Sequence, residues 1–584
     1  MSTPSSQLQE VRRFSRPQAA LAGEPPLTTF WLGLWTCGLS LAWLIPNHYP
    51  PWAAFQSDAW TAIMLGLASA AVILRSRAPT QWHASAALVA LLACVPWLQY
   101  SAGLIPFAGQ AWISSAYLFG LLLALLTGQL WEQSCPDQLA DGLFVAIGIA
   151  SVLSVHLQLQ TWLGVIGTGI LDIWSMGLVG ERPYANIGQP NQLATLLIWG
   201  LLACAWGFAK HKVRAPVALL LAAFLLFGIA LTQSRTAWLG LTFMLVATWA
   251  WRKLWGSKWV PWTVTGLFAY FWSCPLILKW LNRVLLLGSE PSYFRVHFED
   301  ETRHLAARLF TQAALDRPWF GYGWSEIGPA QLAMAADFPS LGMTYGHSHN
   351  LFLDLILWVG LPLGMLVSVA LLRWFWTYAR TATTATDAIL VMFLGIVGIH
   401  AMVELPLHYA YFLLPTGMVM GVLNCRSGGK PMWTTPRWTM IGLWLLAAAL
   451  LAGLVRDYFR VESSFQSLRF ELARIGTLPP GQPPDVVLLT QLRERINFMR
   501  YQPKQGMSDD ELVWVQQVAN AYPGGGVSYK TATALALNGR PQEARQWLRK
   551  VCKISKVDEC DLIRRVWAQD SRDNPLIAAV SWPD

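Results

Sequence analysis

Charged residues are scarce in this chain of 584 residues. Asp, Glu, Lys and Arg make up 13% of it, about half of the roughly 25% that soluble domains carry. The hydrophobic content is 54%. Together these values exclude an ordinary soluble multidomain protein and predict a chain embedded in a membrane.

Cysteine is also rare, with 8 residues whose spacing matches no metal-ligand pattern. Cys552 and Cys560 form one close pair, and a disulfide would form there if that part faces an oxidising compartment. The net charge of +9 is not gathered on one basic face, which argues against nucleic-acid binding. Lys and Arg stand instead in short loops beside apolar runs, as the positive-inside bias requires.

Long apolar runs, in contrast, are abundant, and many approach the 20 or so residues that span roughly 30 Å of hydrocarbon. The positive-inside bias places the N-terminus in the cytoplasm, and the odd number of runs then places the C-terminus outside. The thirteen candidate spans are 29–46, 59–74, 84–100, 112–130, 139–159, 192–209, 215–232, 236–251, 259–278, 350–373, 387–404, 410–424 and 438–455.

The spans divide the chain into three parts. Residues 1–28 form a polar cytoplasmic tail, residues 29–455 a transmembrane domain with a large outside loop at 279–349, and residues 456–584 a helical domain outside. In this last part, 529–550 predicts two helices, since Gly539 suits the end of the first and Pro541 the first turn of the second. This pattern is similar to one tetratricopeptide hairpin. Near 139–180 and 259–290, interfacial or re-entrant helices are the alternative to full spans.

Polar side chains that suit chemistry gather in the predicted outside loops. Arg235 stands between two apolar runs on the side where positive charge is unexpected, and its planar guanidinium suits a phosphate or pyrophosphate. A lipid-headgroup anchor or a partner of a loop acid is the alternative for it. Arg182, Gln189 and Asn191 flank a helix start at Pro190, whose N–H groups favour anions, unless they form an ordinary cap.

Two further groups stand near the mouths of later spans. His347 and His349 occur in GHSHN, and imidazole is a base near neutral pH. Glu404 lies one helical turn after His400, and the two either orient a substrate hydroxyl or form a buried polar pair.

Two arginines lie on a predicted helix inside the large loop. The five-residue step from Arg303 to Arg308 does not place both squarely on one face. We expect one of them to reach a phosphate and the other to be solvated.

The ordered set of segments resembles the bacterial O-oligosaccharyltransferases of the PglL type, within the O-antigen ligase and polymerase (WaaL/Wzy) superfamily. The N-terminal signatures are PNHYPPWAAFQSD, which contains His48, PWLQYSAGLIPFAGQ and RPYANIGQPNQLA. TQSRTAWLG, RPWFGYGW and HSHNLFLDLILWVGLPLG resemble the ligase core, and HAMVELPLHYAYFLLP resembles the protein-glycosylating branch. The resemblance covers nearly the whole chain. It implies an all-α, GT-C-like polytopic membrane protein with about 13 transmembrane helices.

The resemblance also implies an activity: en bloc transfer of an oligosaccharide from undecaprenyl pyrophosphate to a Ser or Thr hydroxyl of a periplasmic protein such as pilin. His349, the best match to the family's essential histidine, and Arg235 are the predicted catalytic residues. The residues predicted to bind pyrophosphate or glycan are Arg182, Gln189, Asn191, Arg303, Arg308, His347, Glu404 and His48.

No Asp-x-Asp pair stands in an outside loop, so fixed cations are predicted to stabilise the leaving group without a metal or a cofactor. The expected location is the bacterial inner membrane, with the active site and the C-terminus in the periplasm. The nearest alternatives are an O-antigen ligase acting on the lipid A core and an O-antigen polymerase. A flippase and a periplasmic scaffold are more distant ones.

Overall fold

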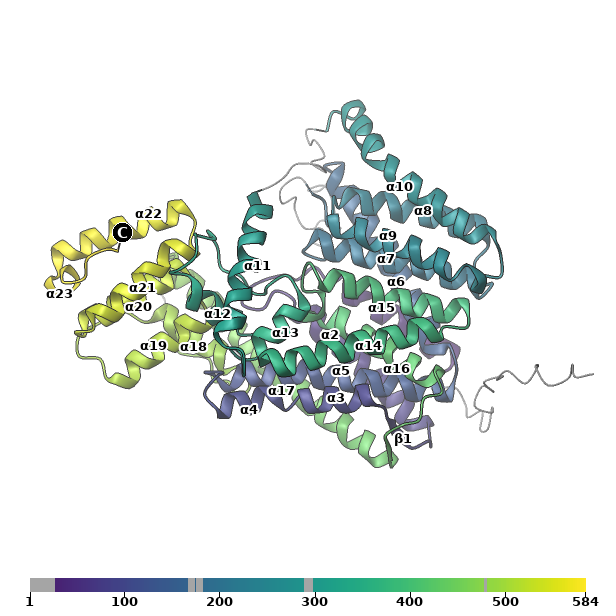
Figure 1. Ribbon diagram of the computed structural model, residues 1–584, viewed down its shortest axis with the longest axis horizontal. Coiled ribbons are helices and arrows are strands. Elements are labelled where there is room, and N and C mark those ends of the chain that lie inside the picture. Colours follow the sequence, from purple (N-terminus) through teal and green to yellow (C-terminus); the bar gives the residue numbers. More distant parts are fainter. Residues whose placement is uncertain (1–26, 166–173, 175–181, 288–297, 477–480, 584) are drawn as a thin grey trace, which may run out of the picture.

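The computed structural model describes residues 27–165, 174, 182–287, 298–476 and 481–583. These residues are mostly helical, and they contain one sheet, of two short strands. The architecture is that of an all-α polytopic membrane protein, as the sequence predicts (Figure 1).

The helices of the first half are α1 (Thr29–Ser40), α2 (Phe55–Arg75), α3 (Ala84–Leu92), α4 (Val95–Ser101), α5 (Ala108–Ser134), α6 (Gln138–Trp162), α7 (Pro190–Ala209), α8 (Ala215–Leu231), α9 (Arg235–Ala250) and α10 (Trp259–Val284). Those of the second half are α11 (Phe298–Asp316), α12 (Ile327–Met334), α13 (Leu351–Val359), α14 (Leu361–Thr381), α15 (Ala385–Ala401), α16 (Ala410–Arg426), α17 (Arg437–Leu472), α18 (Thr490–Arg500), α19 (Asp509–Ala521), α20 (Gly525–Leu537), α21 (Pro541–Ile554), α22 (Val557–Asp573) and α23 (Pro575–Ala578). Short 3₁₀ helices lie at Leu41–Trp43, Arg252–Leu254 and Pro406–His408.

Local sequence explains where the helices near the site begin. α7 starts at Pro190, where a missing N–H and a fixed φ do not disturb the helix. α9 follows Ser234, whose hydroxyl accepts from the Ala237 N–H at 3.3 Å. α13 follows Asn350, whose side chain accepts from two backbone N–H groups at 3.1 Å each. Each of these caps satisfies donors that a helix start leaves without partners.

Within the described ranges, eight helical segments are long and apolar enough to cross a membrane: Phe55–Arg75, Ala84–Ser101, Ala108–Ser134, Gln138–Trp162, Pro190–Ala209, Trp259–Val284, Leu361–Thr381 and Arg437–Leu472. α8 and α15 are shorter apolar helices. Each of the thirteen predicted runs overlaps a helix, while the count of thirteen spans stays a prediction.

The predicted run 350–373 is divided into α13 and α14 at Gly360. Its φ of 83° lies in the left-handed region, and a Cβ there would come within 2.2 Å of the Trp319 carbonyl oxygen. Only glycine accommodates both conditions. The break therefore results from close packing of the segment after α11 against the start of α14.

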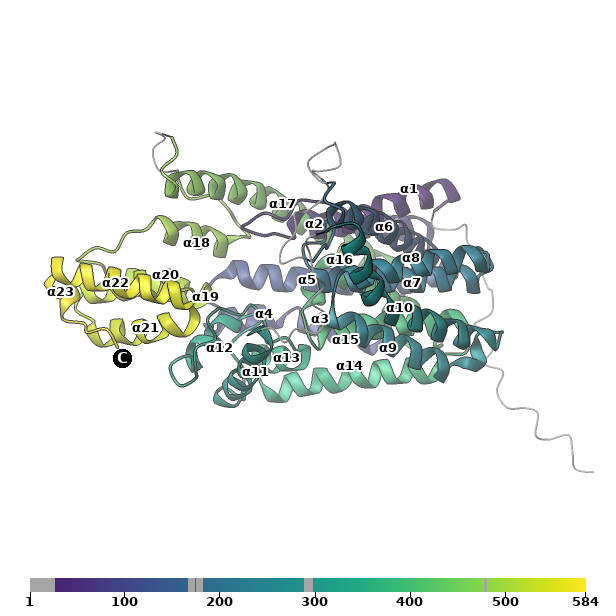
Figure 2. The ribbon, with the colours of Figure 1, turned by 90° about the horizontal axis from the view of Figure 1, so that it is seen from above.

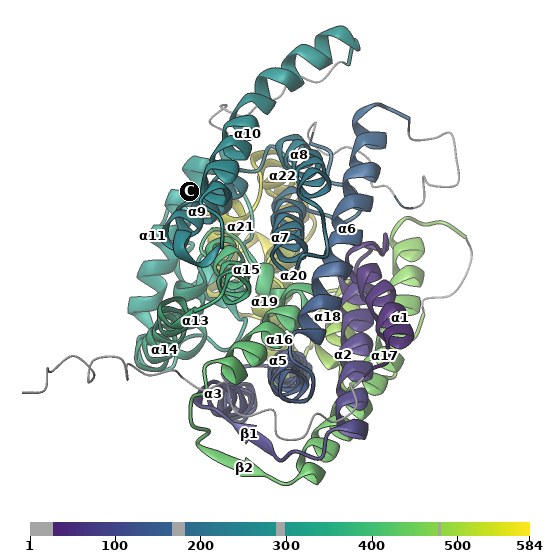
Figure 3. The same cartoon turned by 90° about the vertical axis from the view of Figure 1, so that its right-hand side faces the viewer.

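In one half of the bundle α5 packs along α16, and in the other half α7 packs against α6, α8, α9 and α15 (Figure 3). Large aromatic side chains fill the interior, including Trp199, whose ring stacks on Phe393 with centroids 3.9 Å apart. Strands β1 (Thr80–Trp82) and β2 (Trp433–Thr435) pair antiparallel at one end of the bundle. The tail helices α18 to α23 lie at the other end (Figures 1 and 2).

Helix α17 connects the bundle to the tail. It has 36 residues and continues through the predicted domain boundary at 455. The predicted hairpin in the tail is present as α20 and α21, and between them Gly539 has a φ of 74°. Cys552 and Cys560 form a disulfide that joins the end of α21 to α22.

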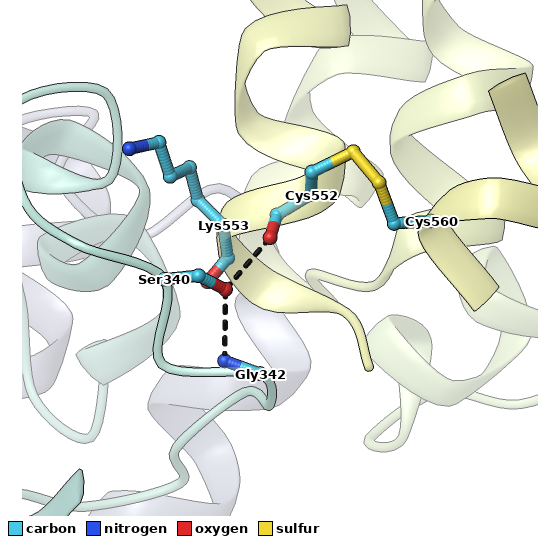
Figure 4. Close-up of a disulfide and its surroundings, with 5 residues drawn as sticks. All are labelled: Ser340, Gly342, Cys552, Lys553 and Cys560. Carbon is cyan, nitrogen blue, oxygen red and sulfur yellow. Dashed lines mark hydrogen bonds between the residues drawn. A yellow bond between two sulfur atoms is a disulfide. The ribbon is translucent and has the colours of Figure 1, made fainter. Parts of the chain in front are cut away.

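The tail is docked onto the segment between α12 and α13. Leu341 donates its N–H to the Lys553 carbonyl oxygen at 3.0 Å, and the Ser340 hydroxyl donates to the Cys552 carbonyl oxygen at 2.7 Å (Figure 4). The Lys553 ammonium donates to the Phe338 carbonyl oxygen at 2.8 Å. The disulfide therefore holds the end of α21 at the point where it meets this segment.

Candidate active site

Glu404 is the centre of a polar cluster at the tail-facing end of the bundle. It follows α15, and only 4% of its side chain is exposed. Its Oε1 accepts from Arg303 Nη2 at 2.8 Å and from Asn191 Nδ2 at 3.2 Å. Its Oε2 lies 3.6 Å from His349 Nδ1, an ion-pair distance. One carboxylate thus joins α7, α11 and the loop before α13.

The two arginines of α11 are separated by their position on the helix. Five residues turn an α-helix by about 140° from the starting direction. Arg303 faces Glu404 and is half-buried, whereas Arg308 is exposed. The structure therefore brings only Arg303 into the Glu404 cluster.

His347 and His349 lie side by side, with ring centroids 4.0 Å apart. His349 has a φ of 61°, a left-handed conformation that is uncommon outside glycine. Its N–H donates to His347 Nδ1 at 3.1 Å, and its own Nδ1 lies 3.3 Å from the Val403 carbonyl oxygen. The Ser348 N–H donates to Asp354 at 2.8 Å, which ties the turn to α13. These contacts hold the His349 imidazole against the Glu404 loop.

Charge states in the cluster follow from burial and contact. Burial, with the nearby His349, lowers the pKa of His347 to about 3, so this imidazole is neutral at pH 7. Burial alone would raise the pKa of Glu404, but its contact with His349 and the charge of Arg303 lower it to about 2. At pH 7 the cluster therefore contains the ionised carboxylate of Glu404 and the neutral imidazole of His347, which can accept a hydrogen bond.

Asn191 extends the cluster to the start of α9. The Ser234 hydroxyl, which caps α9, donates to Asn191 Oδ1 at 2.6 Å. Arg235 is the first residue of α9 and is exposed to solvent. Arg235 therefore directly follows Ser234, which is linked to Glu404 through Asn191.

Arg182 supports the turn before α9. Its Nε donates to the Thr232 carbonyl oxygen at 3.2 Å and its Nη2 to the Gln233 carbonyl oxygen at 2.8 Å. Gln233 has a φ of 49°, so the turn is in a conformation that needs support. Arg182 places a second guanidinium beside the turn that leads to Arg235.

Gln189 and His48 lie at the loop that leads into α7. Gln189 Oε1 accepts from Gln192 at 2.9 Å. His48 contacts the Asn186 carbonyl oxygen through Nε2 and the Ala53 carbonyl oxygen through Nδ1, at 3.2 Å for the latter. Both residues support the 182–191 loop, and no contact of either with Glu404 or His349 is seen in the described part of the chain.

Three supporting residues are not among the site residues predicted from the sequence. The Thr195 hydroxyl and His400 Nδ1 are 2.8 Å apart beneath the cluster, and Ser234 links Asn191 to α9. Asp58 accepts from Tyr117 at 2.7 Å and from the Ala410 N–H at 2.6 Å, so it holds the start of α16. Hydroxyls in apolar helices are common, but Asp58 is a lone acid in an apolar run, a sequence signal that marks such positions.

His347, His349 and Glu404 also form the group that could hold a metal ion, since their ligand atoms lie within 4.8 Å of one another. Tetrahedral zinc with bonds of about 2.0–2.1 Å would need these atoms roughly 3.4 Å apart. One Glu404 oxygen already accepts from Arg303 and Asn191. The other oxygen, Oε2, lies 3.6 Å from His349 Nδ1, so an ion bound there would compete with this contact.

Three family models match the chain. Residues 183–206 match a protein glycosylation ligase model, 218–368 an O-antigen ligase model, and 388–554 the C-terminal model of a virulence factor membrane-bound polymerase. Asn191, Ser234, Arg303, His349 and Glu404 all lie in matched segments. The models therefore cover the cluster that the structure assembles.

Two curated relatives come from Acinetobacter baylyi. The chain is 29% identical over 539 residues to a general O-oligosaccharyltransferase, which covers 89% of this chain and 91% of the relative. It is 28% identical over 247 residues to a ComP-specific O-oligosaccharyltransferase, which covers 42% and 44%. The first likeness extends over the bundle and the tail together.

Proposed function

The chain belongs to the O-oligosaccharyltransferases of the PglL type in the O-antigen ligase superfamily, and from that premise we propose its reaction. It transfers an oligosaccharide en bloc from undecaprenyl pyrophosphate to a Ser or Thr hydroxyl of a periplasmic protein such as pilin, without a metal. The observation that carries this proposal is the Glu404 cluster, which joins Arg303, His349 and the Asn191–Ser234 link to Arg235.

In this proposal the protein lies in the bacterial inner membrane, with its N-terminus in the cytoplasm and the cluster and tail in the periplasm. Two observations support this orientation. Arg426 ends α16 next to a short loop, where the positive-inside bias favours the cytoplasmic side, and it pairs with Glu132 at the end of α5 that is remote from the tail. The Cys552–Cys560 disulfide is typical of an oxidising compartment.

The leaving group is a lipid-linked pyrophosphate, whose oxygens gain negative charge as the bond to the anomeric carbon breaks. Arg235, Arg182 and Arg303 present guanidinium groups around the α9 start and the Glu404 loop. A planar guanidinium binds phosphate oxygens through two parallel hydrogen bonds. Cations positioned before the reaction stabilise the developing charge without reorganising.

The acceptor hydroxyl attacks the anomeric carbon from the face opposite the pyrophosphate, so the anomeric configuration inverts. One C–O bond forms, the C–O bond to phosphate breaks, and the hydroxyl proton passes to the His349 imidazole. Glu404 orients that imidazole and stabilises the positive charge it gains, as a carboxylate does for a catalytic histidine. Arg303 keeps Glu404 ionised.

The test is co-expression with a lipid-linked glycan pathway and a candidate pilin, followed by intact-mass measurement of the pilin. We expect the pilin to gain the mass of the whole oligosaccharide, and Arg235→Ala and His349→Ala to abolish that gain while both proteins insert normally. His304→Ala is the matched control, because His304 is exposed on α11 beside Arg303. Activity should persist in the presence of a chelator.

Different outcomes reject different parts of the proposal. Glycan found on the lipid A core instead of the pilin would make the chain an O-antigen ligase. Full transfer by Arg235→Ala or His349→Ala would remove that residue from the mechanism. Loss of transfer with chelator, reversed only by a divalent ion, would replace the arginine mechanism with a metal-dependent one.

A further inference from the structure

A cavity of about 380 Å³ lies between the tail and the loop before α13, which carries His347 and His349. One wall is formed by the segment just before the histidines, including Thr344, Tyr345 and Gly346. The opposite wall comes from α18 to α20 and includes Arg495 and Tyr522. No step of the reaction described above uses this cavity.

Two residues that line the cavity, Tyr345 and Gly346, lie next to the histidines. The Tyr345 ring lies edge-on to the His349 ring, with centroids 5.6 Å apart, and Gly346 directly precedes His347. The segment is held in place by buried Gln331 of α12, which accepts from the Tyr345 N–H and donates to the Met343 carbonyl oxygen, both at 2.8 Å. Any occupant of the cavity therefore touches residues that contact the imidazoles.

The walls combine apolar, aromatic and cationic groups. Phe498 and Val527 contribute apolar surface from the tail. The Arg495 guanidinium lies 5.0 Å over the Tyr522 ring, and within the described residues no carboxylate forms an ion pair with it. Such a lining provides apolar contact together with a donor for a carbonyl or carboxylate oxygen, which is what recognition of a polypeptide requires.

The described residues that line the cavity include no carboxylate, and the acid next to them in the chain is buried. Glu326 follows Ser325, a lining residue, and is almost fully buried, where Gln110 donates to its Oε1. Burial raises the pKa of Glu326 to about 8, so its carboxyl is mostly neutral at pH 7. A molecule bound in the cavity would therefore contact the positive charge of Arg495.

The cavity exists because the tail is docked. The contact of Ser340 with the end of α21 (Figure 4) and that of Leu341 fix the two walls relative to one another. The tail thereby forms one wall of the cavity, and the other wall leads directly into the turn that carries His347 and His349. A tail that only anchored the protein would have no need to complete such a recess.

We infer that this cavity is the acceptor subsite, which holds the stretch of acceptor polypeptide next to the Ser or Thr that receives the glycan. The inference rests on the proposed function and names the place where its protein substrate binds. An extended chain advances about 3.3–3.6 Å per residue. If one residue of the acceptor lies against Gly346, a Ser or Thr two or three residues further along the acceptor can therefore reach His349.

Gly346 allows a graded test. A Cβ at this position would meet no atom within 4 Å, and the backbone does not require glycine. We expect Gly346→Ala to be tolerated, and Gly346→Leu and Gly346→Trp to reduce transfer to the pilin by at least tenfold as they fill the cavity. Arg495→Gln should raise the pilin concentration needed for half-maximal transfer more than it lowers the maximal rate.

Gly526→Leu is the matched control. Gly526 is exposed on α20, a Cβ there would also meet no atom within 4 Å, and it does not line the cavity. Donor binding is measured separately, as retention of the lipid-linked glycan by each purified variant. Retention should be unchanged in the Gly346 series.

Photo-crosslinking keeps the test valid if a bulky variant fails to fold. The crosslinker p-benzoylphenylalanine replaces Thr344, which is exposed and lines the cavity, or Leu562, which is 54% exposed on α22. We expect the pilin to crosslink at position 344 and not at 562.

The results separate the two proposals. If the wild type does not modify the pilin, the proposed function and the subsite both fail. Wild-type transfer with no effect in the Gly346 series and no crosslink at position 344 would overturn only the subsite. Loss of glycan retention in Gly346→Leu, or a crosslink to the glycan lipid, would assign the cavity to the donor instead.

Discussion

Arg303 Nη2 lies 2.8 Å from Glu404 Oε1, and this pair joins two segments that are 101 residues apart in the chain. The contact fixes α11 against the loop after α15. Because His349 contacts the other oxygen of the same carboxylate, the ion pair also sets the position of the imidazole relative to the guanidinium groups.

Arg303→Ala is therefore expected to impair glycan transfer. A hydrogen bond between charged groups contributes about 1.5–3 kcal/mol, and about 1.4 kcal/mol corresponds to a factor of ten in rate. We expect transfer to fall by roughly 10- to 100-fold, measured as the initial rate of pilin modification. Arg308→Ala, on the exposed side of the same helix, should stay within about twofold of the wild type. Equal losses in both variants would contradict the assignment.

Glu404 should make the free energy of unfolding depend on pH in the acid range. Its folded-state pKa of about 2 lies below the ordinary value of 4.5, so the unfolded chain binds the proton more readily. The contribution of Glu404 is complete above pH 4.5 and is lost as the pH falls from 4.5 toward 2. Thermal unfolding in detergent should show this loss for the wild type and a flatter profile for Glu404→Gln. Parallel profiles would show that the carboxylate is not held ionised.

Glu326 should have the opposite effect on the free energy of unfolding, which it lowers as the pH rises. Its folded-state pKa is raised to about 8, so the folded protein binds the proton more readily than the unfolded chain does. Stability then falls as the pH rises from 4.5 to 8. Glu326→Gln keeps an oxygen for Gln110 and removes the titration. We expect this variant to unfold at a higher temperature than the wild type at pH 8, whereas at pH 4.5 the two should be similar.

Removing the disulfide should loosen the tail. Cys552 and Cys560 are separated by 8 positions, and a closed loop of this size corresponds to about 2–3 kcal/mol in the chain-entropy account. Cys552→Ser with Cys560→Ser should lower the unfolding temperature. It should also speed proteolysis near the end of α21, because Ser340 and Leu341 dock there. Cys135→Ser, a change at an unpaired cysteine of the bundle, is the control.

Much of the fold follows from local sequence. The α20–α21 hairpin was predictable because Gly539 and Pro541 act within a few residues of their own position. The division at Gly360 was not, because it depends on the Trp319 carbonyl, which lies 41 positions earlier in the chain and next to Gly360 in space. The extension of α17 past residue 455 was also missed, since a drop in hydropathy marks the end of an apolar surface and not the end of a helix.

Single candidate residues could be chosen from the sequence, but the way they assemble could not. Arg235, His349 and Glu404 are noticeable in the sequence because isolated polar groups are rare beside apolar runs. Their contacts depend on how α7, α11 and α15 pack. The bond between Asn191 and Glu404 links residues 213 positions apart, and no periodicity in the sequence encodes it. The spacing of Arg303 and Arg308 showed only that they face different ways, and packing decides which one faces inward.

The uninterrupted course of α17 fixes the angular setting of the whole tail. Each residue of an α-helix adds about 1.5 Å of length and 100° of rotation. Deleting a single residue from the middle of its 36 would turn the tail by about 100° around the helix axis. An insertion or deletion in α17 would keep the tail facing the loop before His347 only if it were close to a whole turn, three or four residues.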